Sequence, residues 1–250
     1  MKRVSSGIKG LDELLGGGFP KGKCILIVGS PGSGKTTFVM QYLYGGALID
    51  ENGLYVAMDE RPDQVKENLS GFGWNLEKLE KEGKLFFIDA TPLKKVKKVS
   101  YESLMQEPKS EVIITIPELS LGRLVRTIHK IVNEENISRI AVDPITSLML
   151  RYYDKVKRRK AMLMFFDALS ETGCTSLVTT ELRTGILKRS FQLEEFLSQG
   201  TILLYTIIHD GNVIRAIQIE KMRGIFHDTQ LRPYQITNKG IEVFPKDRIF

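Results

Sequence analysis

The residues with the clearest chemical signature form a glycine-rich segment that fits the pattern G-x-x-x-x-G-K-[ST] in full. They are Gly29, Ser30, Pro31, Gly32, Ser33, Gly34, Lys35 and Thr36, followed by Thr37. In such a loop backbone N–H groups surround phosphate oxygens, the lysine reaches the β- and γ-phosphates, and the Ser/Thr hydroxyl ligates Mg²⁺. We therefore predict a site for Mg²⁺ and a nucleoside triphosphate, with Lys35 on the phosphates and Thr36 on the metal.

Acidic side chains end two apolar segments elsewhere in the chain. Asp143 closes RIAVD, the Walker B pattern of the carboxylate that holds the water shell of a P-loop magnesium. Asp59 and Glu60 follow LYVAM. Because ligands of open parallel sheets bind beyond the carboxyl ends of the strands, we expect this pair to face the γ-phosphate, where an acid orients and deprotonates water. A solvated acid pair is the alternative interpretation of Asp59 and Glu60.

Positioning these groups requires a sheet with helices packed against it. Apolar runs predict strands, and periodic segments between them predict helices. The expected strands are 24–28, 54–58, 85–89, 139–143 and 175–180, and the expected helices are 35–50, 62–70, 120–136 and 156–172. Hairpins at 201–220 and 233–244 follow, and 91–119 is expected to be irregular. The pattern predicts an α/β fold with a mostly parallel central sheet, helices on both faces and C-terminal antiparallel strands.

The composition is that of a globular protein of one large or two small domains, and the α/β pattern favours one domain over residues 1–250. Hydrophobic residues make up 42% of the chain and charged residues 26%, which excludes disordered and fibrous proteins. No apolar run approaches the ~18 residues of a transmembrane helix, and no apolar segment of a secretory signal follows the basic start. Cys24 and Cys174 lie in apolar segments and are expected to be buried thiols, which suits a reducing compartment. We expect a cytoplasmic protein without membrane association.

The net charge of +6 comes from two short segments. Residues 94–98 (KKVKK) hold four basic residues and no acid, and residues 151–160 (RYYDKVKRRK) hold six basic residues and one acid. Without these segments the chain has 26 basic and 29 acidic residues. Each run is either a solvated face or a docking site for a protein partner or nucleic acid.

Longer stretches resemble the KaiC-like branch of the RecA/RadA superfamily. Besides the phosphate loop, the resemblance covers 7–22 (GIKGLDELLGGGFPKG), 59–92, 141–148 (AVDPITSL), 178–181 (VTTE) and 219–245, hence nearly the whole chain. It implies a P-loop RecA-like core and an ATPase that assembles as a homo-oligomeric ring, usually a hexamer, with ATP between neighbouring subunits. It also implies that Glu60 is the catalytic glutamate and Asp59 its partner.

The resemblance also assigns roles in the second half of the site. Ser70 matches a residue near the nucleotide base. Lys221 and Arg223 match a basic pair that reaches the γ-phosphate of the neighbouring subunit, and Met222 and His227 match residues that line that side. Alternate residues of a strand share a face, so Lys221 and Arg223 are able to act together on phosphate charge. From the local pattern alone, the same residues form a solvated hairpin end.

One KaiC activity is not expected. The second KaiC domain phosphorylates itself on adjacent Ser and Thr residues, and the matching positions, Glu195 and Phe196, have no hydroxyl. The local sequence LEEFL at 193–197 instead resembles the first KaiC domain, which hydrolyses ATP without this modification. We expect the two acids to face and repel the γ-phosphate, and Ser198 to point elsewhere on an extended chain. The prediction is a slow ATPase, a regulatory or signalling switch without autophosphorylation.

Two other classes remain open. A DNA-binding recombinase or recombinase mediator of the RecA/RadA type would use the basic runs as DNA contacts. Against it, we expect no N-terminal DNA-binding domain, since 28 residues precede the phosphate loop. A nucleotide-binding signalling module would instead recruit a partner in its ATP state. A GTPase is disfavoured, because Asn238-Lys239 is followed by Gly240 and not by an acid that recognises guanine.

Overall fold

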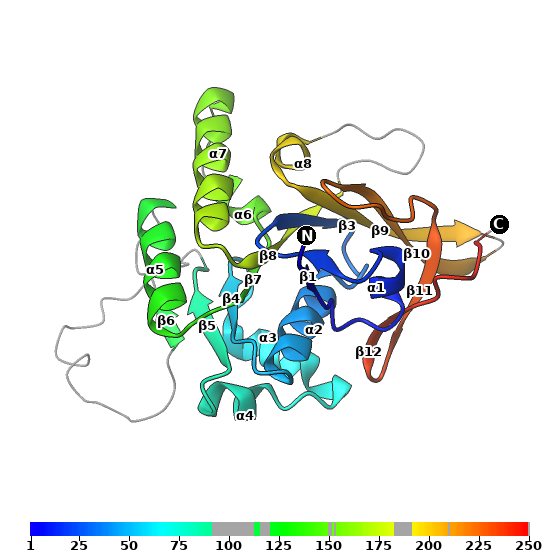
Figure 1. Cartoon of the computed structure of the whole chain (residues 1–250), viewed down its shortest axis with the longest axis horizontal. Coiled ribbons are helices and arrows are strands. Elements are labelled where there is room, and N and C mark those ends of the chain that lie inside the picture. The colour runs from blue at the N-terminus through cyan, green and yellow to red at the C-terminus, as the bar shows by residue number, and fades with distance from the viewer. Residues whose placement is uncertain are drawn as a thin grey trace.

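A ten-stranded sheet organises the part of the chain that the structure describes (Figure 1). The computed structural model describes residues 1–91, 113–115, 121–149, 152, 154–182, 192–209 and 211–249. The strand order across the sheet is β12-β11-β10-β9-β3-β8-β7-β4-β5-β6.

Seven neighbouring strands are parallel, of which six lie on one side of β9 (Gly200–His209). In order across the sheet these six are β3 (Cys24–Gly29), β8 (Thr175–Glu181), β7 (Arg139–Asp143), β4 (Gly53–Ala57), β5 (Leu85–Asp89) and β6 (Ile113–Thr115). β3, β4 and β7 are buried at every position, because helices cover both faces of the sheet. The carboxyl ends of these strands share one edge of the sheet, where the predicted site residues follow β3, β4 and β7.

Helices on the two faces enclose two hydrophobic cores (Figure 1). One face carries α2 (Lys35–Ala47), α3 (Pro62–Leu69) and α4 (Leu76–Lys81), with a 3₁₀ turn η1 (Ser70–Phe72) after α3. The other face carries α5 (Leu121–Glu134), α6 (Thr146–Met149) and α7 (Lys155–Glu171). Ile25 and Ile27 of β3 enter the first core, whereas Leu26 and Val28 enter the second, as the two-residue period of a strand requires.

On the other side of the sheet the parallel strands end with β9, and antiparallel strands follow. β9 (Gly200–His209) runs parallel to β3 and antiparallel to β10 (Asn212–Met222), which pairs with β11 (Arg232–Thr237). β11 and β12 (Gly240–Val243) form a hairpin. Smaller elements are β1 (Arg3–Val4), α1 (Leu11–Leu14), β2 (Phe19–Pro20) and α8 (Leu193–Leu197), and β1 and β2 pair with each other.

The expected fold class is confirmed, with a mostly parallel sheet, helices on both faces and antiparallel C-terminal strands. Two local expectations are wrong. Residues Ile113–Thr115, expected to be irregular, form β6 because this apolar run pairs with β5. The segment expected to be extended before β9 contains the helix α8. The rest of 91–119 beyond Thr91, including the basic run 94–98, lies outside the described residues.

Both cysteine thiols are free and buried, as expected. Among the helices that the structure describes, none is long and apolar enough to cross a membrane.

Candidate nucleotide-binding site

The glycine-rich loop connects β3 to α2 at the carboxyl edge of the sheet. Gly32 and Gly34 have φ values of +77° and +87°, a left-handed conformation that disfavours other residues. A Cβ on Gly29 would lie 2.3 Å from the Ser33 hydroxyl, so this position has no room for a side chain. The Lys35 ammonium donates hydrogen bonds to the carbonyl oxygens of Gly29 at 2.8 Å and Ser30 at 3.1 Å. The loop thus wraps around its own lysine, at the N-terminus of a 13-residue helix.

Asp143 is the most heavily bonded carboxylate of the site. It is 6% exposed and accepts hydrogen bonds at Oδ2 from the hydroxyls of Thr36, at 2.7 Å, and Tyr55, at 2.8 Å. The Thr179 hydroxyl donates to the other oxygen, Oδ1. Three hydroxyls from α2, β4 and β8 therefore fix the orientation of one carboxylate at the end of β7.

Asp59 and Glu60 lie beside this cluster, after the end of β4. Ser147 donates to Asp59 at 3.1 Å, and the Asn68 amide donates to Glu60. A cavity of about 170 Å³ joins both acids to the phosphate loop. Its walls are Lys35, Thr36, Tyr55, Asp59, Glu60, Asp143, Pro144 and Glu181. One cation and four carboxylates from different elements thus meet in one small polar space.

Burial and charge shift two pKa values in this cavity. Burial lowers the pKa of Lys35, while the nearby carboxylates of Asp143 and Glu181 oppose the shift. Burial, followed by the Asp143 carboxylate, raises the pKa of Tyr55 well above its usual range. The Tyr55 phenol therefore keeps its proton at neutral pH and remains a donor to Asp143.

The residues fit a magnesium triphosphate. Mg²⁺ prefers oxygen ligands, and the Thr36 hydroxyl and the Asp143 carboxylate lie within hydrogen-bond distance of each other. The loop offers a lysine, left-handed glycines and a helix N-terminus to phosphate oxygens. The Ser33 hydroxyl is buried in this loop with no hydrogen-bond partner among the described residues.

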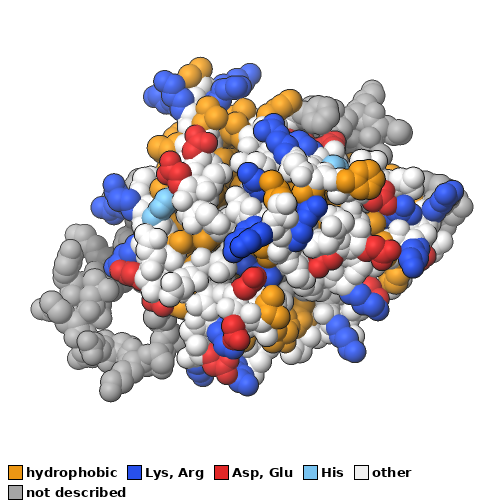
Figure 2. All heavy atoms as spheres, viewed as in Figure 1, with side chains coloured by type: hydrophobic (Ala, Val, Ile, Leu, Met, Phe, Trp, Pro, Cys, Tyr) orange, Lys and Arg blue, Asp and Glu red, His pale blue; other side chains and the backbone are white. Residues whose placement is uncertain are grey.

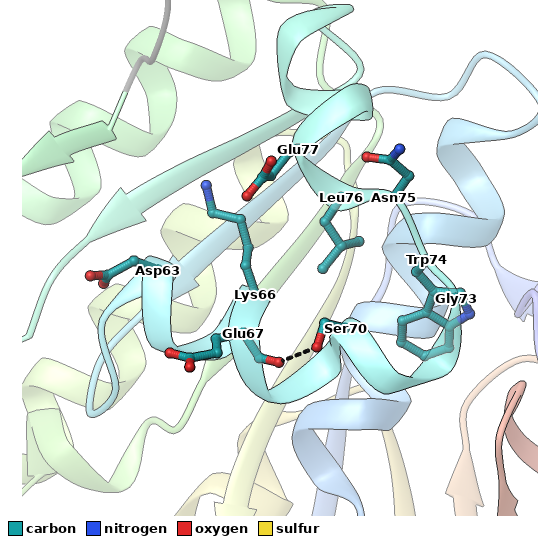
Figure 3. Close-up of a pocket in the computed structure, with 9 residues that line it drawn as sticks. All are labelled: Asp63, Lys66, Glu67, Ser70, Gly73, Trp74, Asn75, Leu76 and Glu77. Atoms are coloured by element: carbon teal, nitrogen blue, oxygen red, sulfur yellow. Dashed lines mark hydrogen bonds between the residues drawn. The ribbon is translucent and has the colours of Figure 1, made fainter.

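Ser70 lies apart from the phosphate cavity. It is exposed at the end of α3, and its hydroxyl donates to the Glu67 carbonyl at 2.7 Å. Figure 3 shows it at one side of a larger cavity of about 580 Å³, which α3 and the segment leading into α4 enclose. In the same view Lys66 lies one turn before Ser70 on α3, whereas Glu77 lies on the opposite wall, at the start of α4. The two cavities share no wall residue.

The basic pair expected to reach the γ-phosphate of a neighbouring subunit lies at the end of β10. Neither residue lines the phosphate cavity of its own chain. The Lys221 ammonium donates to the carbonyl oxygens of Glu195 and Ser198, the latter at 2.8 Å. Burial and then the Arg223 charge lower the pKa of Lys221, against the raising effect of nearby acids. Met222 is buried, whereas Arg223 is exposed.

His227 is partly buried in the segment after β10, with Nδ1 3.3 Å from the Ile225 carbonyl oxygen. The neighbouring Phe226 is 90% exposed. The backbone N–H of Asp228 donates to the Leu14 carbonyl, which ties this segment to α1. Lys221 is in β10, which β9 separates from β3, the strand before the phosphate loop.

The acids of α8 do not stand free at the site, contrary to the expectation that they repel a γ-phosphate. Glu194 is 2% exposed and accepts from the Thr180 hydroxyl at 3.2 Å. Glu195 accepts from the backbone N–H of Gln192 in a capping box that starts the helix. Ser198 is fully buried, and its hydroxyl donates to the Glu195 carbonyl.

The second basic run forms the start of α7. Residue 152 and residues 154–160 of this run are described, and Asp154 caps the helix by accepting from the Lys157 N–H at 2.7 Å. Figure 2 shows Lys and Arg side chains gathered at the free end of this helix. The exposed residues of the run, among those described, are Asp154, Lys155, Val156, Lys157, Arg159 and Lys160. Cations at a helix N-terminus oppose the helix dipole, so stability of α7 does not explain them.

Several residues that build the site were not predicted from the sequence. Glu181 ends β8 at the same edge as Asp143, so the rule that selected strand-end acids could also have found it. Tyr55 and Thr179 lie inside apolar strands, where their hydroxyls give no local signal. Asn68 is in α3, and its bond to Glu60 depends on the turn between β4 and that helix.

The parallel sheet and the loop at 29–36 define a P-loop nucleotide-binding protein with a RecA-type fold. The profile of the family described as "ATPase: KaiC" matches residues 4–248. The chain therefore belongs to the KaiC-like ATPase family.

Relatives and solved structures agree with this family. A UPF0273 protein of Pyrococcus furiosus is 32% identical over 246 residues, which are 98% of this chain and 95% of the relative. The circadian clock oscillator protein KaiC of Synechococcus elongatus is 32% identical over 95% of this chain, which covers 43% of KaiC. A crystal structure of a KaiC-like protein from Pyrococcus horikoshii OT3 superposes with a TM-score of 0.80 at 33% identity, covering 98% of this chain and 99% of that one.

Proposed function

We propose that this protein is a Mg²⁺-dependent ATPase consisting of one KaiC-like domain over residues 1–250. The observation that carries the proposal is the 2.7 Å hydrogen bond between Thr36 and Asp143, in a cavity that Lys35 and Glu60 also line. Those four side chains come from α2, β7 and the end of β4, and each has a part in phosphoanhydride hydrolysis.

The chain's own groups divide the work as follows. Lys35 and the N–H groups of the loop bind the phosphates, and Thr36 and Asp143 hold the metal with its water shell. Magnesium, when bound, neutralises charge that develops on the phosphate oxygens. Glu60 orients the attacking water and accepts its proton, with Asp59 as its partner. The Asn68 amide holds the Glu60 carboxylate in the cavity.

The catalytic site is completed in an assembly of several subunits. In this proposal the protein forms a ring, usually of six, with ATP between neighbours, and Lys221 and Arg223 of one subunit stabilise the γ-phosphate charge bound by the next. Met222 and His227 line that side, and Ser70 lies near the base. The support is that these cations lie away from the phosphate cavity of their own chain, so they need a second subunit to act on it.

We further propose that hydrolysis serves a cytoplasmic regulatory or signalling switch and not metabolism, without autophosphorylation. The positions that would accept a phosphoryl group are Glu195 and Phe196, and the nearest hydroxyl, Ser198, is fully buried with its hydrogen bond made to Glu195. Neither a carboxylate nor a phenyl ring gives the stable phosphate ester of a modified serine or threonine.

A second candidate function is that of a DNA-acting ATPase of the RecA/RadA type. The exposed cations at the start of α7 favour it, because phosphate backbones bind such clusters through counterion release. The same cations would equally suit an acidic protein partner.

The experiment that separates these functions measures the rate of phosphate release with and without single-stranded DNA, together with the mass of the assembly in ATP. The proposal predicts hydrolysis that DNA leaves unchanged and a mass of several subunits. Faster phosphate release in the presence of DNA would instead support the DNA-acting ATPase. A fully active monomer at low concentration would overturn the composite site.

Subunit mixing tests the composite site itself. Arg223→Ala subunits keep Glu60, and Glu60→Gln subunits keep Arg223, so some interfaces of a mixed ring regain a complete site. We expect activity in the mixture that neither variant has alone.

A further inference from the structure

The C-terminal hairpin packs directly on the phosphate loop. The hydroxyl of Tyr234, in β11, donates to the backbone carbonyl of Ser33 at 2.6 Å. Tyr234 is 2% exposed and Ser33 is fully buried, so water does not compete for this bond. Beside it, a Cβ on Gly34 would lie 2.8 Å from the Cδ1 atom of Ile236 and 3.5 Å from that of Ile241. The hairpin therefore occupies one side of the loop at Ser33 and Gly34.

The bond to Ser33 fixes more than one carbonyl. In a trans peptide unit the C=O and the next N–H point in opposite directions. A Ser33 carbonyl held on the hairpin side therefore directs the Gly34 N–H away from the hairpin. This peptide unit rotates through ψ of Ser33 and φ of Gly34, and Gly34, which is in a left-handed conformation, permits such rotation at little cost. Without an anchor, this peptide unit can therefore turn over.

The hairpin is itself firmly held. The Gln41 side chain, on α2, accepts from the Ile241 N–H at 2.6 Å and donates to the Ile241 carbonyl at 3.1 Å. The ring of Trp74 lies so close to Gly240 that a Cβ there would be 2.7 Å from it. Tyr234 is thus presented to the loop by a hairpin whose second strand, β12, is tied to α2 and to the segment before α4.

We propose that Tyr234 is a positioning residue for nucleotide binding, which sets the Ser33–Gly34 peptide so that the Gly34 N–H faces the phosphates. This inference rests on the proposed function, because it needs phosphates in the loop. Tyr234 touches neither the nucleotide nor the reacting atoms and acts through the backbone alone.

The kinetic signature follows from the position of the peptide. The Gly34 N–H belongs to the loop that holds the phosphates before and after hydrolysis, so its loss weakens the ground state and the transition state alike. Loss of such uniform binding raises KM and leaves kcat unchanged. Burial raises the pKa of Tyr234, so the phenol remains protonated and able to donate throughout the range of the assay.

The test compares Tyr234→Phe with Tyr42→Phe by calorimetric titration of ADP and β,γ-imido-ATP. Tyr42 is the matched control, because its buried hydroxyl also donates to a backbone carbonyl, that of Thr175 at 2.9 Å, at the opposite end of β8 from the phosphate cavity. We expect Tyr234→Phe to bind both nucleotides about fivefold more weakly than the unmodified protein, the scale of one ordinary hydrogen bond. Tyr42→Phe is expected to bind them normally, with a similar loss of thermal stability.

The ATPase assay and a second variant complete the test. For Tyr234→Phe we expect KM for ATP to rise by the same factor while kcat stays constant. If this variant is unfolded at the assay temperature, Ile236→Val removes only the methyl group nearest Gly34 and is expected to weaken binding of both nucleotides to a smaller extent. Unmodified protein that binds neither nucleotide would refute the proposed function and this inference together. Unmodified protein that binds both, with Tyr234→Phe binding equally well, would refute this inference alone.

Discussion

The replacement Thr179→Val probes the hydroxyl cluster around Asp143. Thr179 is fully buried in β8, and its hydroxyl is the donor to Asp143 Oδ1, whereas Thr36 and Tyr55 both donate to Oδ2. Valine has nearly the same shape as threonine and carries a methyl group in place of the hydroxyl. The change therefore leaves the packing and removes one donor from a buried carboxylate.

The expected size of the effect comes from that single bond. A hydrogen bond to a charged group contributes about 1.5–3 kcal/mol, so we expect Thr179→Val to lose about 2 kcal/mol of unfolding free energy. For a chain of this length that corresponds to a fall in Tm of about 4–8 °C. Loss of a partner that orients a metal-site carboxylate weakens metal binding about 10- to 100-fold. We therefore expect at least about tenfold more Mg²⁺ to be needed for half of the maximal ATPase rate.

The assay combines thermal unfolding in the absence of nucleotide with a magnesium titration of phosphate release. Ser176→Ala is the control, because Ser176 is fully buried in the same strand but its hydroxyl has no hydrogen-bond partner among the described residues. Removing that hydroxyl should leave both Tm and the magnesium dependence unchanged. If Thr179→Val behaved like Ser176→Ala in both measurements, the assignment of Asp143 as an oriented metal-site carboxylate would be wrong.

Three further predictions concern the core, the thiols and the α8 segment. Gly46→Ala should unfold the protein or lower its Tm by more than 10 °C, because the new Cβ would lie 2.3 Å from Nε of the fully buried Arg139; circular dichroism on heating measures this. Burial raises the pKa of Cys24 and Cys174, so a thiol reagent at pH 8 should label them only after unfolding, and rapid labelling of native protein would contradict it. Incubation with ATP and Mg²⁺ should give no species heavier by about 80 Da, and such a species mapped to residues 190–201 would disprove the absence of autophosphorylation.

The parallel half of the sheet was predictable because its strands are continuous apolar runs, and glycines and acids mark where these runs begin and end. The segments 85–89 and 139–143 have the bounds that the sequence predicts, as β5 and β7. β6 was missed although it begins with two isoleucines, because it is three residues long and stands in a segment with three prolines and five lysines. Helix α8 was missed because a capping box between Gln192 and Glu195, and not a hydrophobic period, starts it.

The residues of the candidate site also fall into two groups, those that a local sequence pattern predicts and those that it does not. Motif spacing brings Lys35 and Thr36 together, and the strand-end rule adds Asp143 and Glu60, since both signals are local in the sequence. The hydroxyl of Tyr55 and the anchor Tyr234 are contacts between residues 88 and 201 positions apart, which no local pattern encodes. These contacts become visible only when the arrangement of the strands in the sheet is known.

The central claim is that Glu60 activates water for ATP hydrolysis in the cavity beside Lys35. The most direct measurement is the rate of phosphate release by the unmodified protein and by Glu60→Gln, with ATP binding measured on both and Lys35→Ala as the binding-deficient reference. The account predicts that Glu60→Gln binds ATP normally and hydrolyses it at least about 100-fold more slowly, the scale of losing a general base, whereas Lys35→Ala loses binding. Turnover by Glu60→Gln at the unmodified rate would contradict it.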